Sequence, residues 1–198
     1  SSFNFPYDHI KDQYKDMIRE KNEKDFDYSE YTDGIWVGYR YFQTAGVDVS
    51  YPFGHGLSYT TFEYSKPVIK ATADGLTATV TVTNTGKAAG KEVVQLYITA
   101  PEGGHVKPAY ELKNFVKTSE LKPGESQTVT MTLTNYDLAS FNEDSSAWEA
   151  AAGTYKVHFA ASVEDIRSTV DYKIKKDQSW KVNPVLFPVN EVTEIKVR

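Results

Sequence analysis

The sequence of 198 residues contains no cysteine. Disulfide bonds and thiolate chemistry are therefore excluded, while the cellular compartment stays open because many exported bacterial proteins also lack cysteine. Long hydrophobic runs are missing as well: no stretch approaches the roughly 18 apolar residues that span a membrane, and the first residues form neither the basic nor the apolar part of a signal peptide. We expect a chain with no membrane segment and no targeting signal of its own, as in an internal or C-terminal fragment.

Basic clusters and metal-ligand spacings are also absent. The formal net charge is −5, so the cationic surface of a nucleic-acid binder is missing. The four histidines are scattered and have no cysteine to complete a zinc site, and the glycine pair at 103–104 is not followed by the residues of a phosphate-binding loop. We expect no nucleic acid, no metal and no cofactor.

Aromatic residues are plentiful and make up 14% of the chain. Many lie in the first 64 residues, above all in the glycine-rich segment 31–59, which predicts short extended pieces that pack on a surface. A flexible spacer would be rich in glycine and serine and poor in rings. Before this segment, apolar residues at roughly helical spacing predict one short amphipathic helix within 8–30.

From about residue 61 the hydrophobic period becomes two. Alternation of apolar residues with threonine and other neighbours predicts half-buried strands, separated by turn signals, at 62–70, 78–82, 94–98, 110–118, 129–133, 154–162 and 168–174. Short strands without a helix between them favour an all-β, antiparallel β-sandwich. The segment 177–198 contains Pro184 and Pro188, so we expect it to start as an extended, edge-like tail.

Several runs resemble one enzyme family. YTDGIWVGYRYFQTAGVDVSYPFGHGLSYTTFEYS (31–65) is similar to the segment that leads out of the α/β sandwich domain of family 3 glycoside hydrolases, the β-glucosidase and β-xylosidase family. VTVTNTGKAAGKEVVQLYITAP (80–101), ELKNFVKTSELKPGESQTVTMTL (111–133), DLASFNEDSSAW (137–148) and AGTYKVHFAASVEDIR (152–167) resemble the domain that closes many of these enzymes. The resemblance implies an immunoglobulin- or fibronectin-III-like sandwich.

The resemblance also implies a domain division and a role. Residues 1–60 would be the tail of the preceding α/β sandwich domain and a linker, 61–176 the fibronectin type III-like sandwich, and 177–198 an extended C-terminal tail. The family's nucleophilic Asp comes from a TIM barrel and its acid/base Glu from the α/β sandwich, and both normally precede the region matched here. We therefore expect no catalytic residue in this chain, which would be the accessory part of an enzyme that hydrolyses terminal β-linked glucose or xylose with retention.

The aromatic segment is the candidate surface for docking onto the TIM-barrel and α/β sandwich domains. The docking candidates are Trp36, Tyr39, Arg40, Tyr41, Phe53, His55 and Tyr59. Arg40 could offer its planar guanidinium to a carboxylate across the interface, and His55 lies between two glycines that allow a tight turn. Location in the periplasm or outside the cell is a further expectation from the family.

Other interpretations stay open. The same rings could stack on sugars in an autonomous carbohydrate-binding module, an oligosaccharide could touch a loop at the active-site rim, and a protein-interaction module is a weaker possibility. Adjacent carboxylates at 143–144 and 164–165 are expected to be solvated turn residues rather than a catalytic pair, because spacing in sequence does not create the required cleft.

Overall fold

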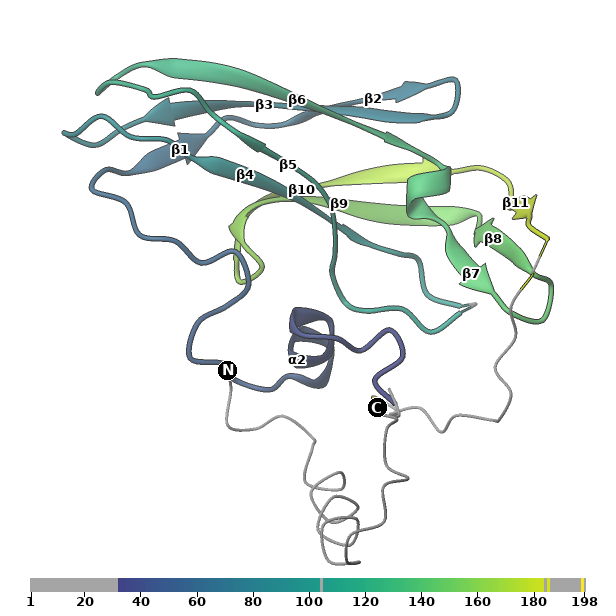
Figure 1. Cartoon of the computed structure of the whole chain (residues 1–198). Coiled ribbons are helices and arrows are strands. Elements are labelled where there is room, and N and C mark those ends of the chain that lie inside the picture. Colours follow the sequence, from purple (N-terminus) through teal and green to yellow (C-terminus); the bar gives the residue numbers. More distant parts are fainter. Residues whose placement is uncertain (1–31, 104, 184, 186–196, 198) are drawn as a thin grey trace, which may run out of the picture.

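The computed structural model describes residues 32–103, 105–183, 185 and 197. The helix expected within 8–30 lies outside the described residues, as do Pro184 and Pro188. Two antiparallel sheets pack face to face, a smaller sheet lies at one end, and a short helix lies beside one of the large sheets (Figure 1). The predicted all-β antiparallel sandwich is confirmed.

The strands follow one another with short connections and a single 3-10 turn. In chain order the elements are α2 (Tyr39–Ala45), β1 (Phe62–Tyr64), β2 (Val68–Thr72), β3 (Gly75–Asn84), β4 (Val93–Thr99), β5 (Glu111–Lys117), β6 (Ser126–Thr134), η1 (Tyr136–Leu138), β7 (Ser140–Asn142), β8 (Ala147–Ala150), β9 (Gly153–Ser162), β10 (Asp165–Ile174) and β11 (Gln178–Lys181). In the first sheet β3 pairs with β1, β2 and β6; the second has the order β10-β9-β4-β5, and the third β11-β8-β7.

Alternation along the strands builds the core. In β3 the apolar residues from Leu76 to Val82 point inward, while the threonines between them point outward. The outward hydroxyls continue as cross-strand pairs with β6, such as Thr81 with Thr128 at 2.8 Å. The inner faces of β4 and β9 supply Leu96 and Phe159, both fully buried. Burial of each such side chain contributes about 1.5–3 kcal/mol, and together these side chains form the main core of the sandwich.

Two predictions about the strands needed refinement. The single strand expected at 62–70 is divided into β1 and β2, because Pro67 has no N–H to donate and restricts the residue before it. The short strands β7 and β8 were not predicted, since three or four residues carry too little periodicity. The tail begins as β11, which pairs with β8.

The prediction of extended structure throughout 31–59 was wrong at one place. Residues Tyr39–Ala45 form helix α2, flanked by Gly38 and Gly46 with φ of 60° and 64°. Glycines in this segment suggest interruptions of extended chain, but Gly38 and Gly46 instead bound a helix. The seven residues between them contain neither glycine nor proline.

Candidate domain-docking site

The aromatic leader, here residues 32–60, lies against the outer face of the β10-β9-β4-β5 sheet (Figure 1). A second apolar cluster forms there, separate from the main core. Tyr97, Ala160 and Val163 are buried in it, and Tyr39 of α2 and Leu112 of β5 pack against them. The leader therefore belongs structurally with the sandwich.

Tyr39 fastens the leader through both its ring and its hydroxyl. The ring stacks on Phe53 with centroids 4.5 Å apart and meets the edge of Tyr97 at 6.0 Å. The hydroxyl oxygen accepts a hydrogen bond of 2.8 Å from the backbone N–H of Leu112. A further bond of 2.9 Å joins the Ala109 N–H to the Thr44 hydroxyl. Helix α2 is thus held to the 105–112 segment by polar as well as apolar contacts.

Arg40 has a carboxylate partner within this chain. Its guanidinium lies 3.6 Å from Glu111 of β5, which also pairs with Lys113 at 3.4 Å. The Arg40 side chain is partly exposed, so the ion pair contributes at most about 1 kcal/mol. The sandwich of this chain therefore supplies a carboxylate partner for Arg40.

The loop that follows α2 is pinned by Gln95. The Gln95 amide nitrogen donates to the carbonyls of Ala161 at 2.6 Å and Gly54 at 3.2 Å, while its oxygen accepts from the Tyr97 hydroxyl at 2.6 Å. The backbone N–H of Val163 donates to the Phe53 carbonyl at 3.0 Å. Gly54 has φ of 81°, and a Cβ there would overlap the Gln95 side chain. The path of the loop is fixed by residues far away in sequence.

Large apolar side chains nevertheless project from this pinned loop into solvent. Leu57 is 95% exposed, Tyr59 100% and Tyr51 75%. Single exposed apolar residues are normal, but three within nine positions make this loop a candidate interaction surface.

The structure separates the docking candidates into two groups. Trp36 is only 5% exposed, and Tyr39 and Arg40 turn toward the sandwich. Tyr41 lies on α2 with its ring edge-on to Phe42 at 5.5 Å. The outward group consists of Phe53, which is partly exposed, His55, whose ring lies 5.4 Å from that of Tyr51, and Tyr59. A docking role for these residues stays a prediction.

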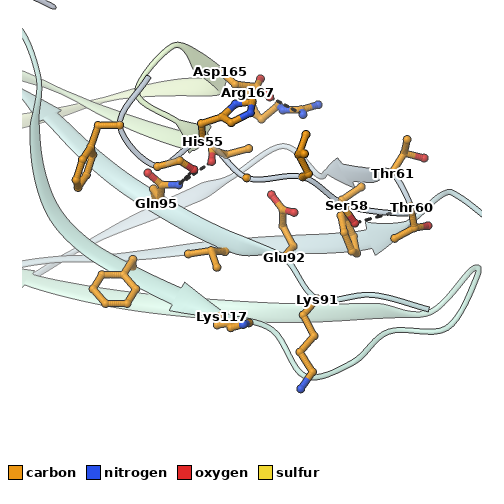
Figure 2. Close-up of a pocket in the computed structure, with 18 of the residues that line it drawn as sticks. His55, Ser58, Thr60, Thr61, Lys91, Glu92, Gln95, Lys117, Asp165 and Arg167 are labelled. Carbon is orange, nitrogen blue, oxygen red and sulfur yellow. Dashed lines mark hydrogen bonds and ion pairs between the residues drawn. The ribbon is translucent and has the colours of Figure 1, made fainter. Parts of the chain in front are cut away.

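A groove of about 750 Å³ opens between this loop and the ends of β4 and β5 (Figure 2). Glu92 lies within it and accepts a hydrogen bond of 2.8 Å from the Tyr64 hydroxyl. Burial raises the pKa of Glu92 above its usual range. Arg167 pairs with Asp165 at 2.7 Å and lies over the Tyr64 ring. No pattern in the sequence indicates this cluster, because its members come from β1, β10 and the residue before β4.

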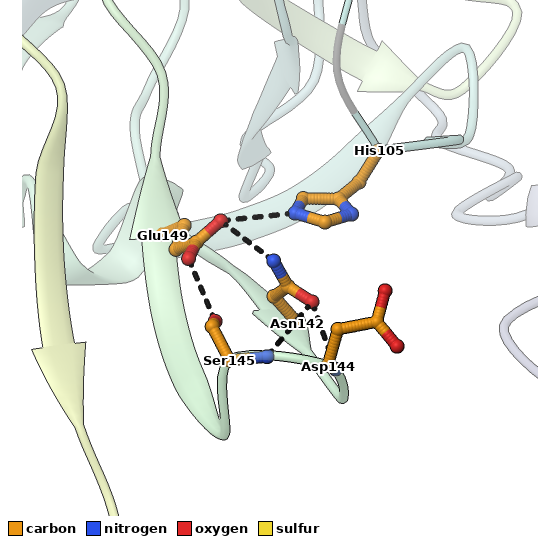
Figure 3. A network of polar contacts seen from close by, with 5 residues as sticks. All are labelled: His105, Asn142, Asp144, Ser145 and Glu149. Atoms are coloured by element: carbon orange, nitrogen blue, oxygen red, sulfur yellow. Dashed lines mark hydrogen bonds and ion pairs between the residues drawn. The ribbon is translucent and has the colours of Figure 1, made fainter.

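A polar network at the other end of the sandwich joins the loop after β4 to the β7–β8 hairpin (Figure 3). Glu149 accepts from Ser145 at 2.7 Å and from Asn142 at 3.1 Å, and it contacts the His105 ring at 3.1 Å. Hydrogen bonds from His105, Asn142 and Ser145 lower the pKa of Glu149 to about 2. The carboxylate therefore stays ionised and acts as an anchor for the loop.

Neither adjacent carboxylate pair has the surroundings of a catalytic dyad. Glu164 accepts from the Gln43 amide at 2.8 Å and Asp165 binds Arg167. Asp144 lies in the hairpin turn, where its N–H donates to Asn142. Within residues 32–103 and 105–183, no group of three or more histidine or acidic side chains could hold a metal, and no helix is long and apolar enough to cross a membrane.

An aromatic ladder crosses the small sheet and was not foreseen. Phe141, Trp148 and Trp180 are cross-strand partners on β7, β8 and β11. Tyr136 packs on both tryptophans, at 5.7 and 5.3 Å. The ring planes are tilted or perpendicular, as in aromatic packing, and the two tryptophans also touch the main core. The ladder closes one end of the sandwich.

Comparison with known proteins gives consistent results. Residues 92–163 match the fibronectin type III-like domain. The chain is 45% identical over 184 residues to β-glucosidase A of Butyrivibrio fibrisolvens, covering 82% of this chain and 22% of that protein. It is 45% identical over 148 residues to β-glucosidase BoGH3A of Bacteroides ovatus, covering 73% and 20% respectively.

Solved structures show the same likeness. The chain superimposes on β-glucosidase 3B of Thermotoga neapolitana in complex with glucose with a TM-score of 0.72 and 44% identity, over 75% of this chain and 20% of that one. For the Kluyveromyces marxianus β-glucosidase in complex with glucose the TM-score is 0.71 and the identity 43%, over 74% and 18%. The chain thus spans about a fifth of the length of these relatives.

Proposed function

Because the chain is related to the β-glucosidases of glycoside hydrolase family 3 and carries their fibronectin type III-like domain, we propose that it is the accessory, structural part of such an enzyme. The relatives are larger enzymes in which this region is one domain. The TIM-barrel and α/β sandwich domains would be its partners. They would hydrolyse terminal β-linked glucose or xylose with retention, in the periplasm or outside the cell.

One observation carries the proposal. The 51–59 loop presents Tyr51, Leu57 and Tyr59 to solvent, although Gln95 and Val163 hold its backbone in place. A loop that merely connected domains would not need a fixed backbone under exposed apolar side chains. A docking surface needs exposed apolar side chains and also a fixed backbone, because preorganisation lowers the entropic cost of association.

The two groups of docking candidates have complementary tasks under this proposal. Tyr39 and Arg40 attach the leader to the sandwich, through the contacts with Leu112 and Glu111. Tyr59 and the exposed parts of Phe53 and His55 are left for another domain to cover. The leader would then act as a rigid adaptor between the catalytic part and the sandwich.

The test is an exchange of parts. The region of Thermotoga neapolitana β-glucosidase 3B that matches this chain is replaced by this chain, and hydrolysis of p-nitrophenyl β-glucoside is measured for the chimaera and for this chain alone. We expect an active chimaera and no turnover by the chain alone. Turnover by the purified chain, or a chimaera that does not fold, would contradict the proposal.

Carbohydrate binding is the second candidate, favoured by the exposed rings of Tyr51 and Tyr59. Flat rings stack on the C–H face of a sugar, and both side chains are available in this chain. Affinity electrophoresis against cellulose, xylan and β-glucan decides it. Retardation that disappears in the Tyr51→Ala, Tyr59→Ala double variant would establish binding, and unchanged mobility in all three gels would remove this candidate.

A further inference from the structure

The apolar cluster under the leader continues beyond the part that the leader covers. A register shift between β4 and β5 occurs at the Leu96/Tyr97 step, where Asn114 and Leu112 are successive partners. This bulge places Leu112 opposite Tyr97 and Phe115 opposite Gln95, so both β5 side chains lie on the outer face. Leu112 is covered by Tyr39, whereas Phe115 is 62% exposed.

Phe115 lies in the groove beneath the 53–61 loop. The same groove is lined by His55 and Leu57 from the loop. Gln95 holds the loop at the Gly54 carbonyl, and Tyr97 in turn donates to the Gln95 oxygen. Phe115 and Leu112 give the groove an apolar floor that extends the contact between leader and sheet.

The charges around the groove are unevenly compensated. On one side Asp165 and Arg167 pair with each other, and Glu92 accepts from the Tyr64 hydroxyl. On the other side Figure 2 shows Lys91 and Lys117, neither of which forms an ion pair within the described part of the chain. Among the described residues Glu92 has no cation partner either, so the lining carries three cations and two carboxylates, and its net charge of +1 favours an acidic partner.

We propose that this groove binds one segment of the catalytic part of the enzyme, with an apolar side chain against Phe115 and Leu57 and an aspartate or glutamate facing Lys91 and Lys117. The inference rests on the proposed function and makes it specific, since it names the place and chemistry of the contact. The groove continues an apolar contact that the leader already makes with the sheet, and a protein segment can extend that contact with an aliphatic or aromatic side chain.

A sugar fits the lining of this groove less well than a protein segment does. Leu57 has no flat face for stacking, and the lysines would meet neutral hydroxyls instead of a charge. Of the described groove carboxylates, Glu92 is the one outside an ion pair, and one of its oxygens already accepts from the Tyr64 hydroxyl. Oligosaccharide binding is therefore an outcome that the experiment must distinguish.

The experiment compares each substitution in the Thermotoga chimaera and in this chain alone. Phe115→Ala removes the apolar contact, and Val68→Ala is its matched control, because Val68 is also an exposed apolar residue but lies on β2. Lys117→Glu reverses the charge, with Lys70→Glu on β2 as control. The readouts are the rate of thermal inactivation of the chimaera and the melting temperature of the isolated chain.

We expect Phe115→Ala to accelerate inactivation of the chimaera about tenfold. The free energy of burying a phenylalanine corresponds to roughly one to two factors of ten in an equilibrium constant. Lys117→Glu should also accelerate it, and the difference should shrink at high salt. Neither control should change the rate, and the isolated chain should melt unchanged with either groove substitution. If Phe115→Ala also lowers the melting temperature of the isolated chain, its effect on the chimaera is not specific to the groove contact. The inference is then tested by the Lys117→Glu variant alone.

Three results would overturn the inference. Groove variants that inactivate no faster than their controls in an active chimaera would leave the accessory role intact and remove the groove contact. Protection of the isolated chain by cellobiose or xylobiose, lost in Phe115→Ala, would assign the groove to sugar. A chimaera that fails to fold would remove the proposed function and this inference together.

Discussion

Replacement of Gly54 by alanine tests how the docking loop is held. Gly54 has φ of 81°, where an L-residue is strained, and a new Cβ would lie 2.7 Å from Cδ of Gln95 and closer still to its amide oxygen. Gln95 cannot simply move aside, because it bonds the carbonyls of Gly54 and Ala161 and the hydroxyl of Tyr97. The substitution therefore combines backbone strain with the loss of buried hydrogen bonds.

The matched control is Gly46→Ala. Gly46 has φ of 64°, but no atom lies within 4 Å of a Cβ built there, so only the backbone cost of about 1–2 kcal/mol applies. For Gly54→Ala a further cost of about 1–3 kcal/mol follows from unpaired buried groups around Gln95. We expect Gly54→Ala to be about 2 kcal/mol more destabilising than Gly46→Ala.

Urea unfolding of the isolated chain, followed by tryptophan fluorescence, measures this difference. The transition midpoint should fall while the slope is unchanged, since the surface exposed on unfolding stays the same. In the double variant Gly54→Ala, Gln95→Ala the two losses should be less than additive, because the clash disappears with the Gln95 side chain. Equal destabilisation by Gly54→Ala and Gly46→Ala would refute this account of the loop.

Three other changes probe the remaining contacts. Tyr39→Phe removes the acceptor of the Leu112 N–H and should cost about 1–2 kcal/mol in urea unfolding, whereas Tyr51→Phe should cost nothing; similar losses would contradict the anchoring role. Burial lowers the pKa of His158 from 6.5, so the stability present above that pH should decline as the pH falls below it, and His158→Gln should remove this component from unfolding curves between about pH 8 and pH 5. His105→Ala should raise the pKa of Glu149 from about 2 toward 4.5, measured by carboxyl carbon chemical shift, and an unchanged value would show that His105 does not hold it down.

The long strands were predictable because alternation of apolar and polar residues along the chain identifies them. Over 76–82 of β3 and 129–133 of β6, each inward residue is apolar and each outward residue is threonine, so the sequence itself displays the two faces. Helix α2 was hidden for a related reason. Helix α2 begins after Gly38 and ends before Gly46, and both glycines have positive φ. Glycine in a sequence, however, is equally typical of a break in extended chain.

The packing of the leader was predictable as a segment and not residue by residue. Composition showed that the rings of the leader need a partner, but Tyr39 and Tyr59 look alike in sequence. Tyr39 turns inward because Leu112, more than seventy positions away, offers an N–H, and Tyr59 meets no such partner in the described chain. Phe115 depends on a bulge in β5, which the sequence ELKNFVK does not display.

Hydroxyl-radical footprinting of the isolated chain and of the Thermotoga chimaera tests the central claim most directly. In the isolated chain Tyr51, Tyr59 and Phe115 are exposed and should be oxidised readily, as should Phe141. In the chimaera we predict that oxidation of the first three falls several-fold while that of Phe141 stays the same. Equal oxidation of all four side chains in both proteins would show that no domain covers this surface, and would contradict its role in docking.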